Sequence, residues 1–175
     1  VPPLERQGRG IVQVGLLLDE ALDRIGIRPD LAAGHSLGEW TGQIVSGTVP
    51  ADSIDELLGG LAPDAVEVPD VVFVALGAGV ETADEIAAGI DQAYVSHDNC
   101  PHQSILCAPQ AVVPAILSAA RERKVMAQEL PFRSGFHSPL FAPFVASMGE
   151  QFAGIPLAVP DVPMWSATTV APYPD

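Results

Sequence analysis

The spacing of apolar residues near the start of the chain predicts two helices with a short strand between them. Apolar side chains recur every three or four residues over Ile11–Ile25, the interval at which one face of an α-helix repeats. Gly26 and Pro29 then end this helix. A short apolar run before Gly34 predicts the strand, and a second helix follows from about residue 37 to residue 45.

The pattern changes at Val71, where short apolar segments begin to alternate with amphipathic ones. The order is strand, helix, strand, strand, helix, strand, over Val71–Leu76, Glu81–Ile90, Ala93–Ser96, Gln103–Cys107, Ala111–Arg123 and Val125–Leu130. This β-α-β-β-α-β order is typical of a split βαβ, or ferredoxin-like, unit. We therefore expect a small unit inserted into a larger α/β layer.

Three further elements are predicted on either side of this small unit. A short helix is expected over Ser53–Leu58, before a pair of glycines. After the small unit, Ser138–Phe152 has the pattern of a helix, and Val162–Trp165 that of a strand returning to the first layer. The fold class predicted from these patterns is α/β.

Composition limits the kind of protein. The chain has 175 residues, of which 48% are hydrophobic, enough for the core of one domain or the larger part of one. Its longest apolar runs fall far short of the roughly 20 residues that span a bilayer. It begins at Val1 without a signal-peptide pattern, which indicates a piece excised from a longer chain. Cys100 and Cys107 form no disulfide framework, so we expect both to be buried and the compartment to be a reducing cytoplasm.

Charge and histidine spacing exclude two classes of function. The net charge of −14 argues against nucleic acid as a partner, because phosphate binding needs clustered cations. A local group of cations could bind an acidic partner, or it could be a solvated helix end whose positive charges interact favourably with the helix dipole. The group comprises Arg121, Arg123, Lys124 and Arg133. The four histidines lack the spacing of metal ligands, so no metal site is expected. His97 and His102 are close enough in sequence to leave a zinc site as a minor alternative.

The segment Gly34-His35-Ser36-Leu37-Gly38 is the first candidate for chemistry. A G-x-S-x-G sequence between a strand and a helix is typical of a nucleophile elbow, in which glycines on either side let the backbone approach closely. Ser36 is then the nucleophile. The Leu37 N–H, at the start of the following helix, is placed to stabilise an oxyanion. The alternative is a glycine-flanked turn that carries an inert serine.

A serine hydroxyl needs a base at neutral pH, and His137 is the candidate. It lies in Phe136-His137-Ser138-Pro139, directly after the small unit and before a predicted helix. A loop in this place is able to reach the elbow. A lone loop histidine is otherwise a common bystander.

Together, Gly34-His35-Ser36-Leu37-Gly38-Glu39 and Gly135-Phe136-His137-Ser138-Pro139-Leu140 resemble the acyltransferase domain of polyketide and fatty acid synthases, the family of malonyl-CoA:acyl carrier protein transacylases. The segment from Asn99 to Cys107 is similar to the Asn-x-Pro segment of that family. The sequences around these motifs, Gly38–Gly42 and Ser96–Ser104, are most similar to those of iterative type I synthases of the enediyne kind, which make antibiotics. The resemblance implies a Ser36–His137 dyad on an α/β-hydrolase-like core with an inserted ferredoxin-like subdomain.

The resemblance also implies a domain layout, a substrate and partners. Residues 1–66 are expected to form the first part of the core, residues 67–132 the inserted subdomain, and residues 133–175 the return to the core with His137. The implied reaction moves a malonyl group from malonyl-CoA to the phosphopantetheine of an acyl carrier protein. No cofactor is implied within the domain, and neighbouring synthase domains are further expected partners.

The sequence departs from the family in three ways. The Gly-Gln-Gly loop that supplies a second oxyanion donor and the segment that orients the histidine are both absent, so the domain is expected to be incomplete. The arginine that pairs with a malonyl carboxylate is also missing, since its place falls near Leu61. Either the substrate has no carboxylate, or neutral donors hold it, with Gln103 and Asn99 as the candidates. These two amides could instead cap strands and turns. Phe136 resembles the residue that in this family accompanies malonyl or acetyl loading, where a serine accompanies methylmalonyl loading.

Two other functions remain open at this stage. A serine esterase or thioesterase uses the same elbow with an acidic third member, for which the candidates are Asp55, Asp64, Asp84 and Asp98. A degenerate scaffold domain would explain the missing arginine but not the presence of both Ser36 and His137.

Overall fold

The computed structural model describes residues 4–50, 53, 56, 68, 70–143, 145, 149 and 152–173. The chain forms two compact units. One unit is a continuous stretch of the chain, Pro63–Ser147. The other unit combines two segments, Pro2–Ala62 and Met148–Asp175. Each unit is described by itself below.

The unit Pro63–Ser147 contains a four-stranded antiparallel sheet in the order β3-β4-β2-β5. Its elements are β2 (Val71–Leu76), α4 (Val80–Ala88), β3 (Tyr94–Cys100), β4 (Gln103–Pro109), the 3₁₀ turn η2 (Gln110–Val112), α5 (Val113–Glu122) and β5 (Ala127–Arg133). This sequence confirms the predicted β-α-β-β-α-β order, with bounds that differ from the prediction by a few residues.

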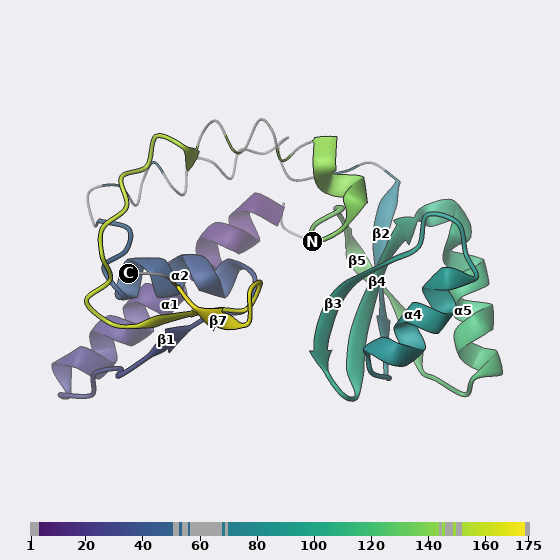
Figure 1. Ribbon diagram of the computed structural model, residues 1–175, viewed down its shortest axis with the longest axis horizontal. Coiled ribbons are helices and arrows are strands. Elements are labelled where there is room, and N and C mark those ends of the chain that lie inside the picture. The colour runs from purple at the N-terminus through teal and green to yellow at the C-terminus, as the bar shows by residue number, and fades with distance from the viewer. Residues whose placement is uncertain are drawn as a thin grey trace. The chain divides into compact units, whose positions relative to one another are not determined.

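One face of this sheet forms the core with α4 and α5, which lie on the same side of it (Figure 1). Strand side chains alternate between the two faces, so Val72, Val74 and Leu76 of β2 all point to the helices, where they are at most 1% exposed. Phe73 therefore points to the opposite face, together with its register partner Cys107 on β4. Both are also buried, because the segment that follows β5 packs there.

After β5 the chain forms a loop over residues 134–138 and then the 3₁₀ turn η3 (Pro139–Phe141), where the sequence predicted the start of an α-helix over residues 138–152. Much of the remaining predicted helix lies outside the described residues, as does most of the predicted helix 53–58. Residues 133–143 belong to the Pro63–Ser147 unit, and the predicted boundary of the inserted subdomain at residue 132 stays a prediction.

The second unit pairs a strand from each of its two segments. It contains α1 (Leu4–Arg24), β1 (Ala32–Ala33), α2 (Leu37–Val45), β6 (Met164–Ser166) and β7 (Ala171–Pro172). Strand β6 is parallel to β1, with Ala32 opposite Met164, which confirms the predicted return of the chain to its first layer. Helix α1 begins at Leu4, before the predicted start at Ile11. The apolar pattern did not predict these first residues because residues 4–10 are mostly polar and show no apolar period.

The apolar stripe of α1 is largely exposed. Val12 is buried, but Ile11, Val14 and Leu18 are each more than half exposed. A groove of about 370 Å³ runs between α1, β1 and α2. None of the described helices combines the length and apolar content that crossing a membrane requires.

The turn between β1 and α2 depends on glycine at one of the two places the sequence singled out. A Cβ on Gly34 would collide with backbone atoms of Gly38 and Glu39. A Cβ on Gly38 would meet nothing within 4 Å among the described residues. The expectation of close backbone approach is therefore confirmed at Gly34 and wrong at Gly38, which lies within the first turn of α2.

We expect Gly34→Ala to destabilise the protein by at least about 1–3 kcal/mol, because backbone atoms cannot move aside as a flexible side chain can. Gly38→Ala is the matched control and should be neutral or stabilising by up to about 1 kcal/mol, since alanine favours helix. Urea unfolding midpoints measure both. Equal midpoints for the two variants would contradict this account of the turn.

Candidate active site

Ser36 occupies a backbone conformation that residues other than glycine rarely adopt. Its φ is 53° and its ψ is −118°, and it lies at the junction between β1 and α2. Such conformations cost roughly 1–3 kcal/mol and are concentrated at functional sites. The residue is exposed, and its hydroxyl does not cap α2. The serine is therefore presented at the surface of its unit by a turn rather than used to start the helix.

The backbone amides of this turn are divided between structural bonds and the open start of the helix. The Gly38 N–H donates to the His35 carbonyl oxygen, and the Glu39 N–H to that of Ser36, both over 2.9 Å. The Leu37 N–H takes part in neither bond, and as the first residue of α2 it has no acceptor within the helix. Its position next to Ser36 and the positive end of the helix dipole suit an oxyanion.

Glu39 anchors the same turn, a role that the sequence did not reveal. One carboxylate oxygen accepts a hydrogen bond from the Ala167 N–H over 2.7 Å, and the other lies 3.5 Å from the Tyr173 hydroxyl. The carboxylate thus ties the first turn of α2 to the segment after β6. Because Ala167 is 128 residues away in sequence, no local pattern could have identified this contact.

His137 lies in the loop after β5, also with a positive φ of 58°. Its ring packs edge to face against the ring of His97 on β3, with 4.8 Å between centroids and 74° between planes. Phe136 lies beside it at 6.4 Å and packs against Phe141 at 4.7 Å. His97 in turn contacts the buried Phe73 at 6.0 Å. A continuous group of rings therefore connects His137 to the sheet.

Polar contacts hold the backbone of this loop against β4. The Ser138 hydroxyl donates to the Gly135 carbonyl oxygen over 2.7 Å and lies 3.3 Å from Cys107 Sγ. Cys107 Sγ is also 3.8 Å from the Ser134 carbonyl oxygen. Burial raises the pKa of the Cys107 thiol, and the hydrogen bond with Ser138 offsets only part of that rise. Cys107 is therefore a neutral structural thiol at neutral pH, whereas Cys100 is exposed, contrary to the prediction.

The two amides proposed to bind a substrate carboxylate lie on either side of the turn that joins β3 to β4. Asn99 Nδ2 donates to Gln103 Oε1 over 3.0 Å. Gln103 is exposed and Asn99 is partly exposed. This bond uses the carbonyl oxygen of Gln103 and leaves its Nε2 outside the pair. The structure thus brings the two amides together. The Gln103 side-chain oxygen accepts the hydrogen bond from Asn99, and this bond sets the orientation of the Gln103 amide.

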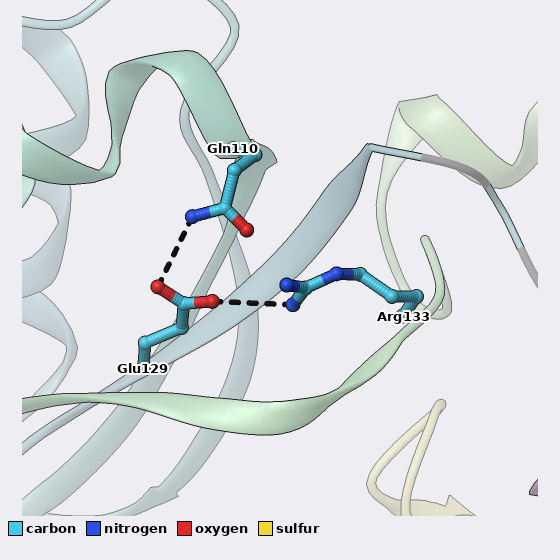
Figure 2. Close-up of polar contacts among 3 residues, drawn as sticks. All are labelled: Gln110, Glu129 and Arg133. Carbon is cyan, nitrogen blue, oxygen red and sulfur yellow. Dashed lines mark hydrogen bonds and ion pairs between the residues drawn. The ribbon is translucent and has the colours of Figure 1, made fainter.

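Arg133 is the cation nearest to His137 in sequence, and it is paired within the sheet. Figure 2 shows Glu129 between Arg133 and Gln110. Arg133 donates to Glu129 Oε1 over 3.2 Å, and Gln110 Nε2 donates to Glu129 Oε2 over 3.1 Å. The charge of Arg133 is therefore neutralised by Glu129, and the pair fixes the end of β5 from which the His137 loop departs.

The predicted site residues fall on both units. Ser36 and Leu37 belong to one unit, and the other carries Asn99, Gln103, Phe136 and His137. Of the acidic candidates for a third catalytic member, Asp84 and Asp98 are exposed, and Asp55 and Asp64 lie outside the described residues. Within the described part of the chain, no three His, Cys, Asp or Glu side chains are arranged to hold a metal ion.

Known proteins resemble this chain over most of its length. It is 26% identical over 184 residues to a mycocerosic acid synthase-like polyketide synthase of Mycolicibacterium smegmatis, covering 98% of this chain and 8% of that protein. The acyltransferase domain of an iterative polyketide synthase in enediyne biosynthesis is 29% identical with a TM-score of 0.82, over 94% of this chain and 44% of that one.

A malonyl CoA–acyl carrier protein transacylase from Clostridium perfringens shares the fold, with a TM-score of 0.88 at 20% identity, over 98% of this chain and 57% of that one. This chain thus spans about half the length of these solved structures and a small fraction of the synthase. The family described as "Acyl transferase domain" matches residues 10–173. The chain therefore belongs to the acyl transferase domain family.

Proposed function

We propose that this chain carries the Ser36–His137 dyad of an acyltransferase that moves a malonyl group from CoA to an acyl carrier protein. The observation that carries the proposal is the positive φ of Ser36 at the start of α2, in a chain of the acyl transferase domain family. In this proposal the β1–β6 pair belongs to an α/β-hydrolase-like core, and the Pro63–Ser147 unit is its ferredoxin-like insertion.

In the first half-reaction, a neutral ring nitrogen of His137 accepts the proton of Ser36 Oγ. The oxygen attacks the thioester carbonyl carbon of malonyl-CoA, forming a C–O bond and a tetrahedral oxyanion. The Leu37 N–H stabilises this oxyanion, and one such donor typically contributes about 3 kcal/mol. The C–S bond then breaks, and the CoA thiolate takes the proton from His137. The product is malonyl-Ser36.

In the second half-reaction, the phosphopantetheine thiol of the carrier protein gives its proton to His137. Its sulfur attacks the ester carbonyl of malonyl-Ser36, the new C–S bond forms, and the C–O bond to Ser36 breaks. His137 returns the proton to Ser36 Oγ. In this proposal the reaction needs no cofactor beyond the malonyl-CoA thioester and the phosphopantetheine thiol of the carrier protein. An iterative polyketide synthase of the enediyne kind is the proposed setting, supported by the 29% identity to such a domain.

The malonyl carboxylate is proposed to bind neutral donors. The family's arginine is absent from the sequence near residue 61, and Glu129 neutralises Arg133. Gln103 Nε2 is then the best donor, because the bond from Asn99 fixes the orientation of its amide. A hydrogen bond to a charged group typically contributes about 1.5–3 kcal/mol.

The covalent intermediate is the first prediction of this function. Incubation with malonyl-CoA should add the mass of one malonyl group to the protein, and Ser36→Ala should abolish the adduct because its oxygen is the acceptor. His137→Ala should slow both loading and unloading, since it serves both half-reactions. Intact-mass spectrometry of the full-length protein measures each. A malonyl adduct of unchanged yield in Ser36→Ala would show that another residue is the nucleophile, and an adduct that water removes faster than the carrier protein does would favour a thioesterase.

The carboxylate-binding role of Gln103 gives a second prediction. Gln103→Ala should lower the loading rate from malonyl-CoA by about 10- to 100-fold, the effect of losing one charge-assisted hydrogen bond. Loading from acetyl-CoA, which has no carboxylate to bind, should change by less than about twofold. His102→Ala, on the same hairpin, serves as the control. Equal losses with both thioesters, or faster acetyl than malonyl loading by the parent, would indicate a carboxylate-free acyl group.

Side-chain size at Phe136 gives a third prediction. The ring packs against Phe141 and His137 and is proposed to fill the space that a 2-methyl branch would need. The parent should prefer malonyl-CoA over methylmalonyl-CoA in direct competition, and Phe136→Ser should reduce this preference. One methyl group is worth about 1–3 kcal/mol, so a preference of roughly 10- to 200-fold is expected. An unchanged ratio in the variant would assign the selectivity elsewhere.

A further inference from the structure

His97 is fixed by three strands of the sheet beneath the His137 loop. It lies on β3 directly after an irregularity in the pairing with β4, between Val95 and His97. Such bulges re-aim the side chain that follows them. The His97 ring also packs edge to face against Phe73 of β2, with 6.0 Å between centroids, and Phe73 is 1% exposed. The imidazole is therefore part of the sheet's packed face.

Ser96 connects the His97 ring to strand β4. The Ser96 hydroxyl lies 3.1 Å from the Ile105 carbonyl oxygen and 2.9 Å from His97 Nδ1. One edge of the ring is therefore held through Ser96 to the backbone of β4.

His137 lies in a loop, where its side chain is exposed and its backbone has a φ of 58°. Phe136, one of the rings beside it, belongs to the same loop and would move with it. The His97 ring, 4.8 Å away, belongs to the sheet and would not. The edge-to-face contact with His97 therefore transfers the rigidity of the sheet to the ring that must accept the Ser36 proton.

We propose that His97 is a positioning residue for His137: it orients the catalytic imidazole through ring contact, without carrying a proton in the reaction. The inference rests on the proposed role of His137 as the base. Proton transfer is sensitive to small displacements of the base, so loss of an orienting contact should lower the chemical step rather than substrate binding.

The test compares His97→Ala, which removes the ring, with His97→Phe, which keeps a ring of similar shape and has no titratable nitrogen. His102→Ala, on the same hairpin and exposed, is the matched control. Each full-length variant is assayed for kcat and KM with malonyl-CoA and for the rate at which a fluorophosphonate labels Ser36. In that labelling, Oγ forms a bond to phosphorus, the P–F bond breaks, fluoride leaves, and His137 takes the serine proton.

We expect His97→Ala to lower kcat and the labelling rate about three- to tenfold, the usual range for one aromatic contact, with KM changed by less than about twofold. His97→Phe should recover the rate to within about twofold of the parent, and His102→Ala should match the parent. Urea unfolding midpoints of all variants show whether a lower rate reflects unfolding. If His97→Ala is unfolded, the rates of the folded His97→Phe variant decide the question.

Two results would overturn the inference. His97→Ala with a parental labelling rate would show that the contact orients nothing, and His97→Phe as slow as a folded His97→Ala would show that the nitrogens matter instead of the ring. The fluorophosphonate needs an activated serine but no particular acyl group. If the parent fails to load malonyl while labelling still depends on the His97 ring, the proposed substrate is wrong and the role of His97 stands.

Discussion

The close approach of Gly34 to the backbone of Gly38 and Glu39 is the constraint on which the nucleophile turn depends. It lets the chain reverse from β1 into α2 within a few residues, and Ser36 is thereby held at a φ of 53°. The parallel pairing of β1 with β6 fixes one side of this turn. Glu39 fixes the other by binding the Ala167 N–H. A strained serine persists only where its surroundings determine its conformation in this way.

The histidine half of the candidate site depends on a different device. The loop that carries His137 follows a strand whose last residue, Arg133, is paired with Glu129, and its Ser138 hydroxyl is bonded within the loop beside the buried Cys107 thiol. These contacts place the backbone, and the rings of His97 and Phe136 hold the side chain. The sheet therefore serves the proposed chemistry through the face that α4 and α5 do not cover.

Sequence reasoning succeeded where the signal was local and periodic. The alternation of apolar segments identified all six elements of the β-α-β-β-α-β unit, and an apolar period of three to four residues that ends at Gly26 identified most of α1. It failed where a contact joins residues far apart in the sequence, or where the backbone geometry of a turn decides which residue fits. Glu39 looked like part of a motif, although its partners lie far along the chain, and Gly38 looked essential because a motif contains it, although the structure leaves room for a side chain.

The same division applies to the candidate site. Ser36 and His137 stand in recognisable local sequences, but the sequence singled out His97 only as part of a minor metal-site alternative with His102. Its contact with His137 joins β3 to the loop after β5, and a bulge in the β3–β4 pairing sets its direction. Neither feature has a sequence signature. The amides of Asn99 and Gln103 were identified from their segment, yet their mutual hydrogen bond required the register of the hairpin.

The central claim is that Ser36 and His137 act as one catalytic unit. The most direct test is a double-mutant cycle on the rate of malonyl transfer from CoA to the carrier protein, using Ser36→Ala, His137→Ala and the double variant. Residues that act as a unit show strongly non-additive losses. The account predicts that the double variant is no slower than the slower single variant. A loss equal to the product of the two single losses would contradict it, because it would show that the two residues act independently.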